Sequence, residues 1–277
     1  MFENITELIG IENGPTSIIL AGVHGNETCG VEALRKILSS LQIEKGRVLF
    51  GYGNPHAIET NQRFTETNLN RMFKSEEMLS NKEKTSYEYG RAQFLKKYLN
   101  QADALLDIHA STTPGSKPFI ICEANADEIS KYLPVDIIVS GFDKVEPGGT
   151  DYYMNSIGKI GICIECGYLD DPQSVQVAED AAIAFLKARG HISNDLTPKK
   201  QSYICMYDIY LTKTEKFTLS KPFDDFETIE RDQIIGTDGD EEVRSLDDSV
   251  ILFAQNSERI GDEAYLLGKK TASHNFT

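Results

Sequence analysis

Residues Thr16–Glu27 read TSIILAGVHGNE, and this stretch decides the fold. Its first part is an unbroken apolar run, which is typical of a strand buried on both faces of a sheet. A glycine-rich segment ends the run, and the next segment, Thr28–Leu41, has apolar residues at helical spacing. A buried strand that leads directly into a helix predicts a β–α unit of an α/β protein.

The same alternation continues through the first two-thirds of the chain. It predicts an α/β sheet with helices on both faces, formed by residues 1–195. After about residue 193 the pattern changes to short alternating segments, which predict a small β-rich C-terminal domain over residues 196–277. We expect the tail, Lys269–Thr277, to be frayed. Further strands are expected at 47–52, 104–108, 135–139, 160–165, 203–211 and 249–254, and helices at 87–99 and 174–188.

The composition argues against several classes of function. The 277 residues carry a formal net charge of -15, so binding of nucleic acid through bulk charge is not expected. No apolar run approaches the roughly 18 residues that span a bilayer. The first ten residues lack the basic and apolar regions of a signal peptide, and the five cysteines are scattered. We therefore expect a cytoplasmic protein that does not act on membranes.

Three residues far apart in the sequence have the side chains of a metal site. His24 and Glu27 follow the first buried strand and lie three residues apart, so one turn of chain can aim both at one point. His109 follows the apolar segment LLDI at the end of another expected strand. Ligands of α/β sheets gather at the carboxyl ends of strands, so the three can converge. Two histidines and one glutamate predict a catalytic zinc site with a fourth position for water.

Glu165 ends a third buried strand, GICIE. A carboxylate in an apolar strand is costly to bury without a role or a partner. We interpret it as the general base for the attacking water and then the general acid toward the leaving amine. A strand-end glutamate paired with an arginine remains the alternative.

A polar segment contains Arg63, Asn68, Asn70 and Arg71, and a glycine-rich loop follows at 146–150. Arginine offers a bidentate fork and asparagine a directional donor, so this segment is a candidate carboxylate clamp. Arg63 is alternatively an oxyanion donor. A solvated loop without function remains open.

The motifs together resemble the succinylglutamate desuccinylase/aspartoacylase family, a branch of the zinc carboxypeptidase-like fold. The segments that carry the resemblance are AGVHGNE, NLNRMF, LLDIHAS, EPGGT and GICIECG, in family order within about residues 16–190. The resemblance implies a central mixed sheet and one zinc ion per chain on His24, Glu27 and His109. It also implies Glu165 as the catalytic carboxylate and Arg63 as oxyanion stabiliser. The remaining implied substrate contacts are Asn70 and Arg71 with the α-carboxylate, and Tyr265 from the C-terminal domain.

Two positions depart from the family pattern. Family members usually have aspartate where this chain has Asn68. Characterised members carry an arginine about ten residues before the catalytic glutamate, where it meets the side-chain carboxylate of the substrate. Ungapped counting places Asn155 there, so an acidic amino-acid product is in doubt.

These observations predict hydrolysis of the amide bond of an N-acyl amino acid by a zinc enzyme, for which a homo-oligomeric state remains open. Three alternatives remain open. The first is a metallocarboxypeptidase-like peptidase or amidase on the same scaffold. The second is a non-catalytic binding protein, and the third is a thiol hydrolase that uses Cys29.

Overall fold

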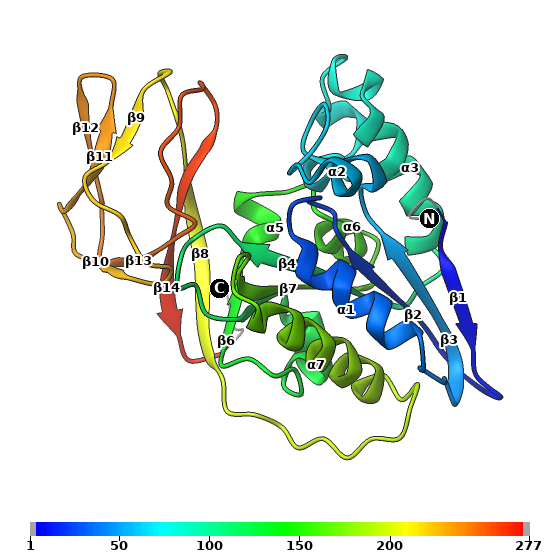
Figure 1. Cartoon of the computed structure of the whole chain (residues 1–277). Helices are drawn as coiled ribbons and strands as arrows, with labels where there is room; N and C mark the ends of the chain where they lie inside the picture. The colour runs from blue at the N-terminus through cyan, green and yellow to red at the C-terminus, as the bar shows by residue number, and fades with distance from the viewer. Residues whose placement is uncertain (1–3, 274–277) are drawn as a thin grey trace.

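One large mixed sheet organises the molecule (Figure 1). The structure is a computed structural model that describes residues 4–273, and in these residues eleven strands form the sheet in the order β1-β3-β2-β4-β7-β5-β6-β8-β14-β13-β10. Strands β3, β2, β4 and β7 are parallel, whereas β5 is antiparallel to β7. The expected α/β class is confirmed. The strands are β1 (Thr6–Ile9), β2 (Glu12–Ala21), β3 (Lys45–Tyr52), β4 (Ala104–Ser111), β5 (Phe119–Cys122), β6 (Ile137–Ser140), β7 (Ile160–Tyr168), β8 (Ser202–Leu211), β10 (Thr228–Ile229), β13 (Ser249–Leu252) and β14 (Glu263–Thr271).

Helices cover both faces of this sheet. In Figure 1, α1 (Thr28–Leu38) and α7 (Gln173–Ala188) lie side by side on one face, where their contact is among the most extensive between helices. Helices α3 (Tyr87–Leu99) and α6 (Thr150–Ser156) pack on the other face. The shorter helices are α2 (Pro55–Thr60), α4 (Asp127–Ser130) and α5 (Phe142–Val145), and single 3-10 turns occur at Leu69–Arg71, Glu76–Met78, Glu83–Thr85 and Ala124–Ala126.

The apolar run of β2 is explained by the two helical layers. Ile19 and Ala21 belong to the core under α1 and α7, whereas Ile18 and Leu20 belong to the core under α3. Successive side chains of a strand point to opposite faces, so a strand covered on both sides needs apolar residues at every position. Burial of these four side chains fixes the register of β2.

Two strands extend further than the sequence suggested. β4 continues to Ser111 and β7 to Tyr168, so His109 and Glu165 lie within strands and not at their ends. The reason is that β4 and β7 continue to pair with each other beyond the end of β2, and β5 pairs with the far side of β7. β4 therefore continues past the end of its pairing with β2, because it still pairs with β7.

The C-terminal segment is rich in strands, as expected. β8 pairs with β6 on one side and with β14 on the other, so these strands continue the central sheet. A second sheet contains β9 (Phe217–Leu219), β11 (Ile234–Asp238) and β12 (Glu241–Arg244). The division into domains at residue 195 stays a prediction.

The expected fraying of the tail is wrong for Lys269–Thr271, which pair with β8, and residues 274–277 lie outside the described residues. Among the described helices, none combines the length and the apolar character that crossing a membrane requires.

Candidate active site

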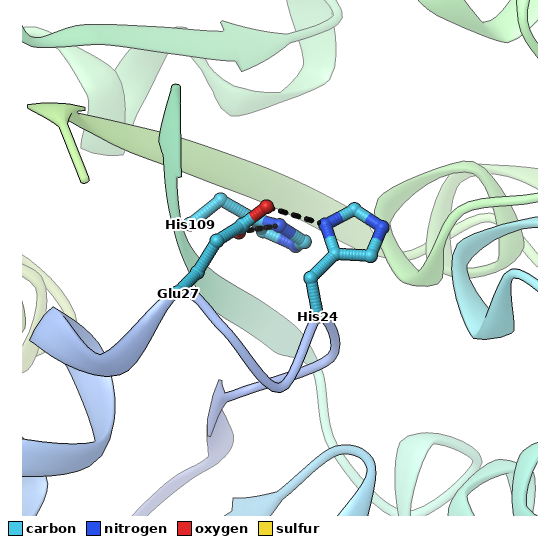
Figure 2. Close-up of side chains that lie close together, drawn as sticks. All are labelled: His24, Glu27 and His109. Carbon is cyan, nitrogen blue, oxygen red and sulfur yellow. Dashed lines mark hydrogen bonds and ion pairs between the residues drawn. The ribbon is translucent and has the colours of Figure 1, made fainter. Parts of the chain in front are cut away.

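Three buried side chains, two from the loop between β2 and α1 and one from β4, converge at one point. His24 follows β2, Glu27 precedes α1, and His109 lies in β4. Figure 2 shows both imidazole rings turned toward the Glu27 carboxylate: His24 Nδ1 lies 2.7 Å from Oε1, and His109 Nδ1 lies 2.9 Å from Oε2. One donor atom from each residue lies within 4.8 Å of the others. The structure therefore brings together the three predicted metal ligands.

Glu27 occupies the N-cap position of α1 without acting as a cap. Its side chain makes no hydrogen bond to the first turn, although the residue types preferred there do so. The carboxylate turns away from the helix to the two imidazoles, and it also accepts a hydrogen bond from the backbone N–H of Ala110 at 3.2 Å. The first turn of α1 therefore has no side-chain cap, because the Glu27 carboxylate faces the two histidines.

Gly25 allows the chain to turn between His24 and Glu27. A β-carbon at this position would lie 2.1 Å from the carbonyl carbon of Ala57, which is backbone and cannot move aside. Only glycine permits this close approach of the two backbones. The path of the chain between His24 and Glu27 therefore depends on Gly25.

The second ring nitrogen of each histidine faces a polar partner. His24 Nε2 lies 3.0 Å from Asn68 Oδ1, and His109 Nε2 lies 3.1 Å from Asp107 Oδ2. Asp107 is fully buried and also accepts a hydrogen bond from the Thr150 hydroxyl. Such outer partners fix the orientation and tautomer of metal-binding imidazoles. Asn68, the departure from the family pattern, thus contacts the ring of a candidate ligand.

The electrostatics of this group suit a cation. Burial and the nearby charge of Arg63 lower the pKa of His24 to about 4, so its ring is neutral. Burial disfavours a charged Glu27, but His24 and His109 outweigh it and hold the pKa of Glu27 well below its usual range. Burial likewise opposes charging of His109, but Asp107 and Glu27 raise its pKa well above the usual range, so without a metal the ring carries a proton that a bound metal ion would displace. Two imidazoles and an ionised carboxylate, all buried, are a donor set that Zn²⁺ accepts.

Glu165 lies next to this group on the neighbouring strand. Residues His109 and Glu165 are direct partners in the β4–β7 pairing. The Glu165 side chain is 7% exposed, and its Oε2 has no hydrogen-bond partner among the described residues. Burial and the charge of Glu27 raise the pKa of Glu165 to about 8. A buried carboxylate with a raised pKa beside a cavity has the properties of a proton-transfer group.

A cavity of about 140 Å³ opens beside the three donors. Arg63 lies in its wall and donates from Nη1 to Glu27 Oε1 at 3.1 Å. Tyr265 closes the other side, and burial raises the pKa of its phenol, which stays protonated. The predicted site residues that line this cavity are His24, Glu27, Arg63, Asn70, Arg71, His109, Glu165 and Tyr265.

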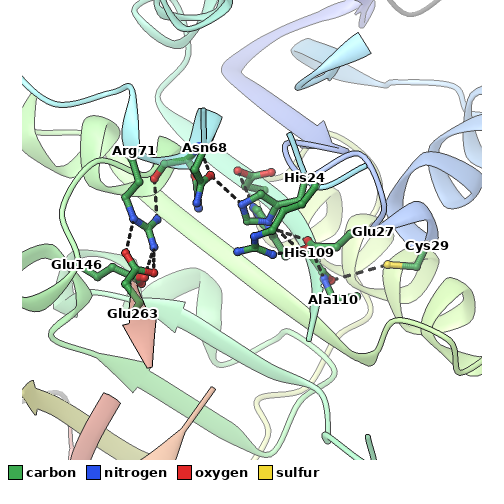
Figure 3. A network of polar contacts seen from close by, with 12 residues as sticks. His24, Glu27, Cys29, Asn68, Arg71, His109, Ala110, Glu146 and Glu263 are labelled. Atoms are coloured by element: carbon green, nitrogen blue, oxygen red, sulfur yellow. Dashed lines mark hydrogen bonds and ion pairs between the residues drawn. The ribbon is translucent and has the colours of Figure 1, made fainter. Parts of the chain in front are cut away.

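Arg71 is held between two carboxylates (Figure 3). Its guanidinium donates to Glu146, and to both oxygens of Glu263 at 2.8 and 2.6 Å. Burial raises the pKa of Glu146 well above its usual range. Glu263 is only partly buried, and although burial opposes its ionisation, its hydrogen bond with Glu146 and the charge of Arg71 lower its pKa to about 2. Glu146 is therefore the protonated member of the group, and Glu263 forms an ion pair with Arg71. This arrangement was not predicted from the sequence.

The structure does not place Asn155 in the cavity wall. Its side chain donates to Asp143 Oδ2 at 3.1 Å and accepts from the backbone N–H of Gly161 at 3.2 Å. Asp143 and Asp151 line the cavity instead. Both lie in short segments whose sequence shows no metal or catalytic motif, so no signal in the sequence singles them out.

Comparison with known proteins identifies the family of this chain. The model of the succinylglutamate desuccinylase/aspartoacylase catalytic domain matches residues 13–188. The chain belongs to this family. A succinylglutamate desuccinylase from Pseudomonas aeruginosa is 38% identical over 73 residues, which are 25% of this chain and 22% of that protein. A probable aspartoacylase from Trichodesmium erythraeum is 29% identical over 163 residues, 54% of each chain.

Solved structures of the family share the fold. The succinylglutamate desuccinylase of Vibrio cholerae superposes with a TM-score of 0.80 at 19% identity, covering 96% of this chain and 85% of that one. The succinylglutamate desuccinylase/aspartoacylase of Rhodobacter sphaeroides gives 0.72 at 18% identity, covering 97% and 89%. The sequence alignments reach only about a fifth to a half of the length of the curated relatives, so family membership alone does not assign a substrate.

Proposed function

We propose that the protein is a zinc-dependent hydrolase that cleaves the amide bond of an N-acyl amino acid. One observation carries the proposal: the buried His24, Glu27 and His109 converge beside the unpartnered carboxylate of Glu165 in one cavity. These three residues would hold one zinc ion, which when bound supplies a Lewis acid that polarises a carbonyl and makes water more acidic.

Glu165 is the proposed proton-transfer group. Its carboxylate takes a proton from the water that attacks the acyl carbon and then delivers it to the nitrogen of the leaving amine. Its location inside a paired strand fixes its distance from His109. Arg63 faces the same cavity and donates hydrogen bonds to the oxygen on which negative charge develops.

Asn70 and Arg71 are proposed to hold the α-carboxylate of the substrate. Arg71 is already balanced by Glu146 and Glu263, so a substrate carboxylate must replace one of them. The Glu263 side chain is 33% exposed and the Glu146 side chain 10%, which makes Glu263 the group that yields. Tyr265 is proposed to contact the bound substrate from the opposite wall.

The walls of the cavity favour a small substrate over a peptide. Residues from the C-terminal segment line part of the cavity: Phe253 and Gln255 follow β13, and Tyr265 lies in β14. A peptidase needs an open cleft for the chain on both sides of the cleaved bond. A thiol hydrolase is disfavoured because Cys29 is buried, contacts the backbone carbonyl of His109, and does not line the cavity. The cytoplasmic location and any oligomeric state remain predictions.

The test combines one variant with a substrate panel. Glu165→Gln keeps the size of the side chain and removes the base, so it should retain one zinc per chain by metal analysis while kcat falls by roughly 100-fold or more on N-acyl amino acids. Glu128→Gln removes an exposed carboxylate and serves as the matched control with full activity. Chelation should abolish activity, and zinc should restore it.

Full turnover by Glu165→Gln would refute this role for Glu165. Zinc binding without turnover of any N-acyl amino acid would favour the non-catalytic binding protein. Activity that persists after chelation would favour thiol chemistry.

A further inference from the structure

The lining of the cavity includes two carboxylates that the proposed chemistry does not use. Asp143 lies in α5 and Asp151 in α6, and both line the cavity that contains Glu165. Neither forms an ion pair with any residue in the part of the chain that the structure describes, 4–273. Acidic side chains in such a partly enclosed position ordinarily meet a cation.

Asp143 is held in position by neutral hydrogen bonding. Asn155 lies one helical turn after Asp151 in α6, and its amide donates to Asp143 Oδ2. The Asn155 oxygen in turn accepts from Asn125 at 3.1 Å and from the backbone N–H of Gly161. This chain of contacts orients the Asp143 carboxylate without cancelling its charge. Asn155 is therefore a positioning residue for this wall.

The two arginines that line the cavity already have carboxylate partners. Arg71 is balanced by Glu263, and Arg63 donates to Glu27. Besides these, the lining contains no arginine or lysine among the described residues. Glu165 is a further carboxylate in the same cavity, more than nine-tenths buried and with Oε2 unpartnered. Asp143 and Asp151 therefore have no arginine or lysine partner among the described residues that line the cavity.

The pKa values of the two aspartates agree with the lack of a cationic partner. Burial and the charge of Asp151 raise the pKa of Asp143 to about 7. Burial and the charge of Asp107 raise the pKa of Asp151 to about 6. A bound cation would stabilise both ionised forms.

We infer that Asp143 and Asp151 form a subsite for the positively charged end of the substrate, which is then an N-acyl amino acid with an ammonium or guanidinium side chain. This inference rests on the proposed function, because it takes the cavity as the substrate site. Ile121 and Phe142 line the same cavity and offer apolar surface to the methylene groups of such a side chain. The acidic wall also opposes a substrate with a carboxylate side chain.

The test compares side chains of similar length and different charge. The zinc-loaded full chain is assayed with Nα-acyl derivatives of ornithine, norleucine and glutamate, each as the acetyl and the succinyl compound. We expect kcat/KM for the ornithine derivative to exceed that for norleucine by roughly tenfold or more, with glutamate lowest. Asp143→Asn and Asp151→Asn should each reduce the ornithine-to-norleucine ratio, and Glu128→Gln, a surface control, should not. Asp143→Lys should raise the relative rate with glutamate.

Binding separates this inference from the proposed function. Calorimetry with Glu165→Gln measures affinity for the same compounds without turnover. Selective binding of the ornithine derivative, weakened by Asp143→Asn, supports the cation subsite even if no compound is hydrolysed, in which case only the proposed function fails. Hydrolysis with norleucine or glutamate preferred overturns the subsite and leaves the proposed function standing. If no compound binds and none is hydrolysed, both are overturned.

Discussion

Replacement of Glu88 by glutamine should destabilise the protein and misplace the segment that carries the proposed anion-binding residues. Glu88 is fully buried in α3. Its carboxylate accepts hydrogen bonds from the Asn54 side chain at 3.1 Å, the Thr65 N–H at 2.8 Å and the Thr65 hydroxyl at 2.5 Å. It also accepts from the N–H groups of Glu66 and Thr67 at 3.2 to 3.3 Å. These contacts hold the chain immediately between Arg63 and Asn68.

The expected loss of stability follows from the number of hydrogen bonds that the Glu88 carboxylate accepts. Hydrogen bonds to a charged group contribute about 1.5–3 kcal/mol each, and glutamine keeps one acceptor oxygen while turning an N–H₂ group toward the remaining donors. The loss of one to two such bonds predicts a reduction in the free energy of unfolding by about 3 kcal/mol. Because Arg63 and Asn70 flank the affected segment, kcat/KM should fall as well.

The effect should depend on pH in a defined direction. Burial opposes ionisation of Glu88, but the hydrogen bonds from Thr65 and Asn54 outweigh it and lower its pKa below the ordinary value of 4.5. A lowered pKa in the folded state adds stability that is fully present above pH 4.5 and is lost as the pH falls through the folded pKa. The difference between wild type and Glu88→Gln should therefore be constant from pH 7 to about 5.5 and shrink below 4.5.

Urea denaturation followed by circular dichroism at several pH values measures this difference, with Glu128→Gln as the exposed control. A loss smaller than about 1 kcal/mol at pH 7 would refute the reasoning, because a surface substitution gives as much. So would a loss that does not change on acidification.

Three further predictions concern the site itself. Asp107→Asn removes the charged partner of a ligand histidine and should weaken zinc affinity about 10- to 100-fold in a competition titration; unchanged affinity would contradict the geometry. Arg63→Gln removes a positive charge that lowers the pKa of Glu165, so the acidic limb of the kcat/KM profile should move to higher pH, and a downward shift would disprove the coupling. Gly25→Ala should cost about 1–3 kcal/mol or more of stability and impair zinc binding, whereas Gly90→Ala, with open space around the new methyl group, should do neither in thermal melts and metal analysis.

The sequence predicted the ligands because their signals are local. AGVHGNE and LLDIH each place a donor directly after an apolar strand, and parallel strands bring such positions to one edge. The strands at 47–52 and 104–108 and the helix at 87–99 were recovered for the same reason, because strong periodicity over many residues specifies an element.

Other features depend on tertiary pairing and could not be read from the sequence. The extension of β4 past His109 requires its pairing with β7, and β5 has only four residues, too few to show a period. The partners of Arg71 come from positions 146 and 263, which no local pattern connects. Asp143 and Asp151 are ordinary acidic residues until the fold places them in one wall.

The pairing of β4 with β7 has a consequence for how such a protein can diversify. His109 and Glu165 are mounted side by side on two interior strands, so their separation is set by backbone hydrogen bonds and tolerates no drift. Asp143 and Asp151 belong instead to two short helices outside the sheet, so their side chains can change while the pairing of β4 with β7 stays in place. The proposed proton-transfer group and the proposed side-chain subsite therefore lie on separate elements, so a substitution in the subsite can change the substrate preference and leave His109 and Glu165 in place.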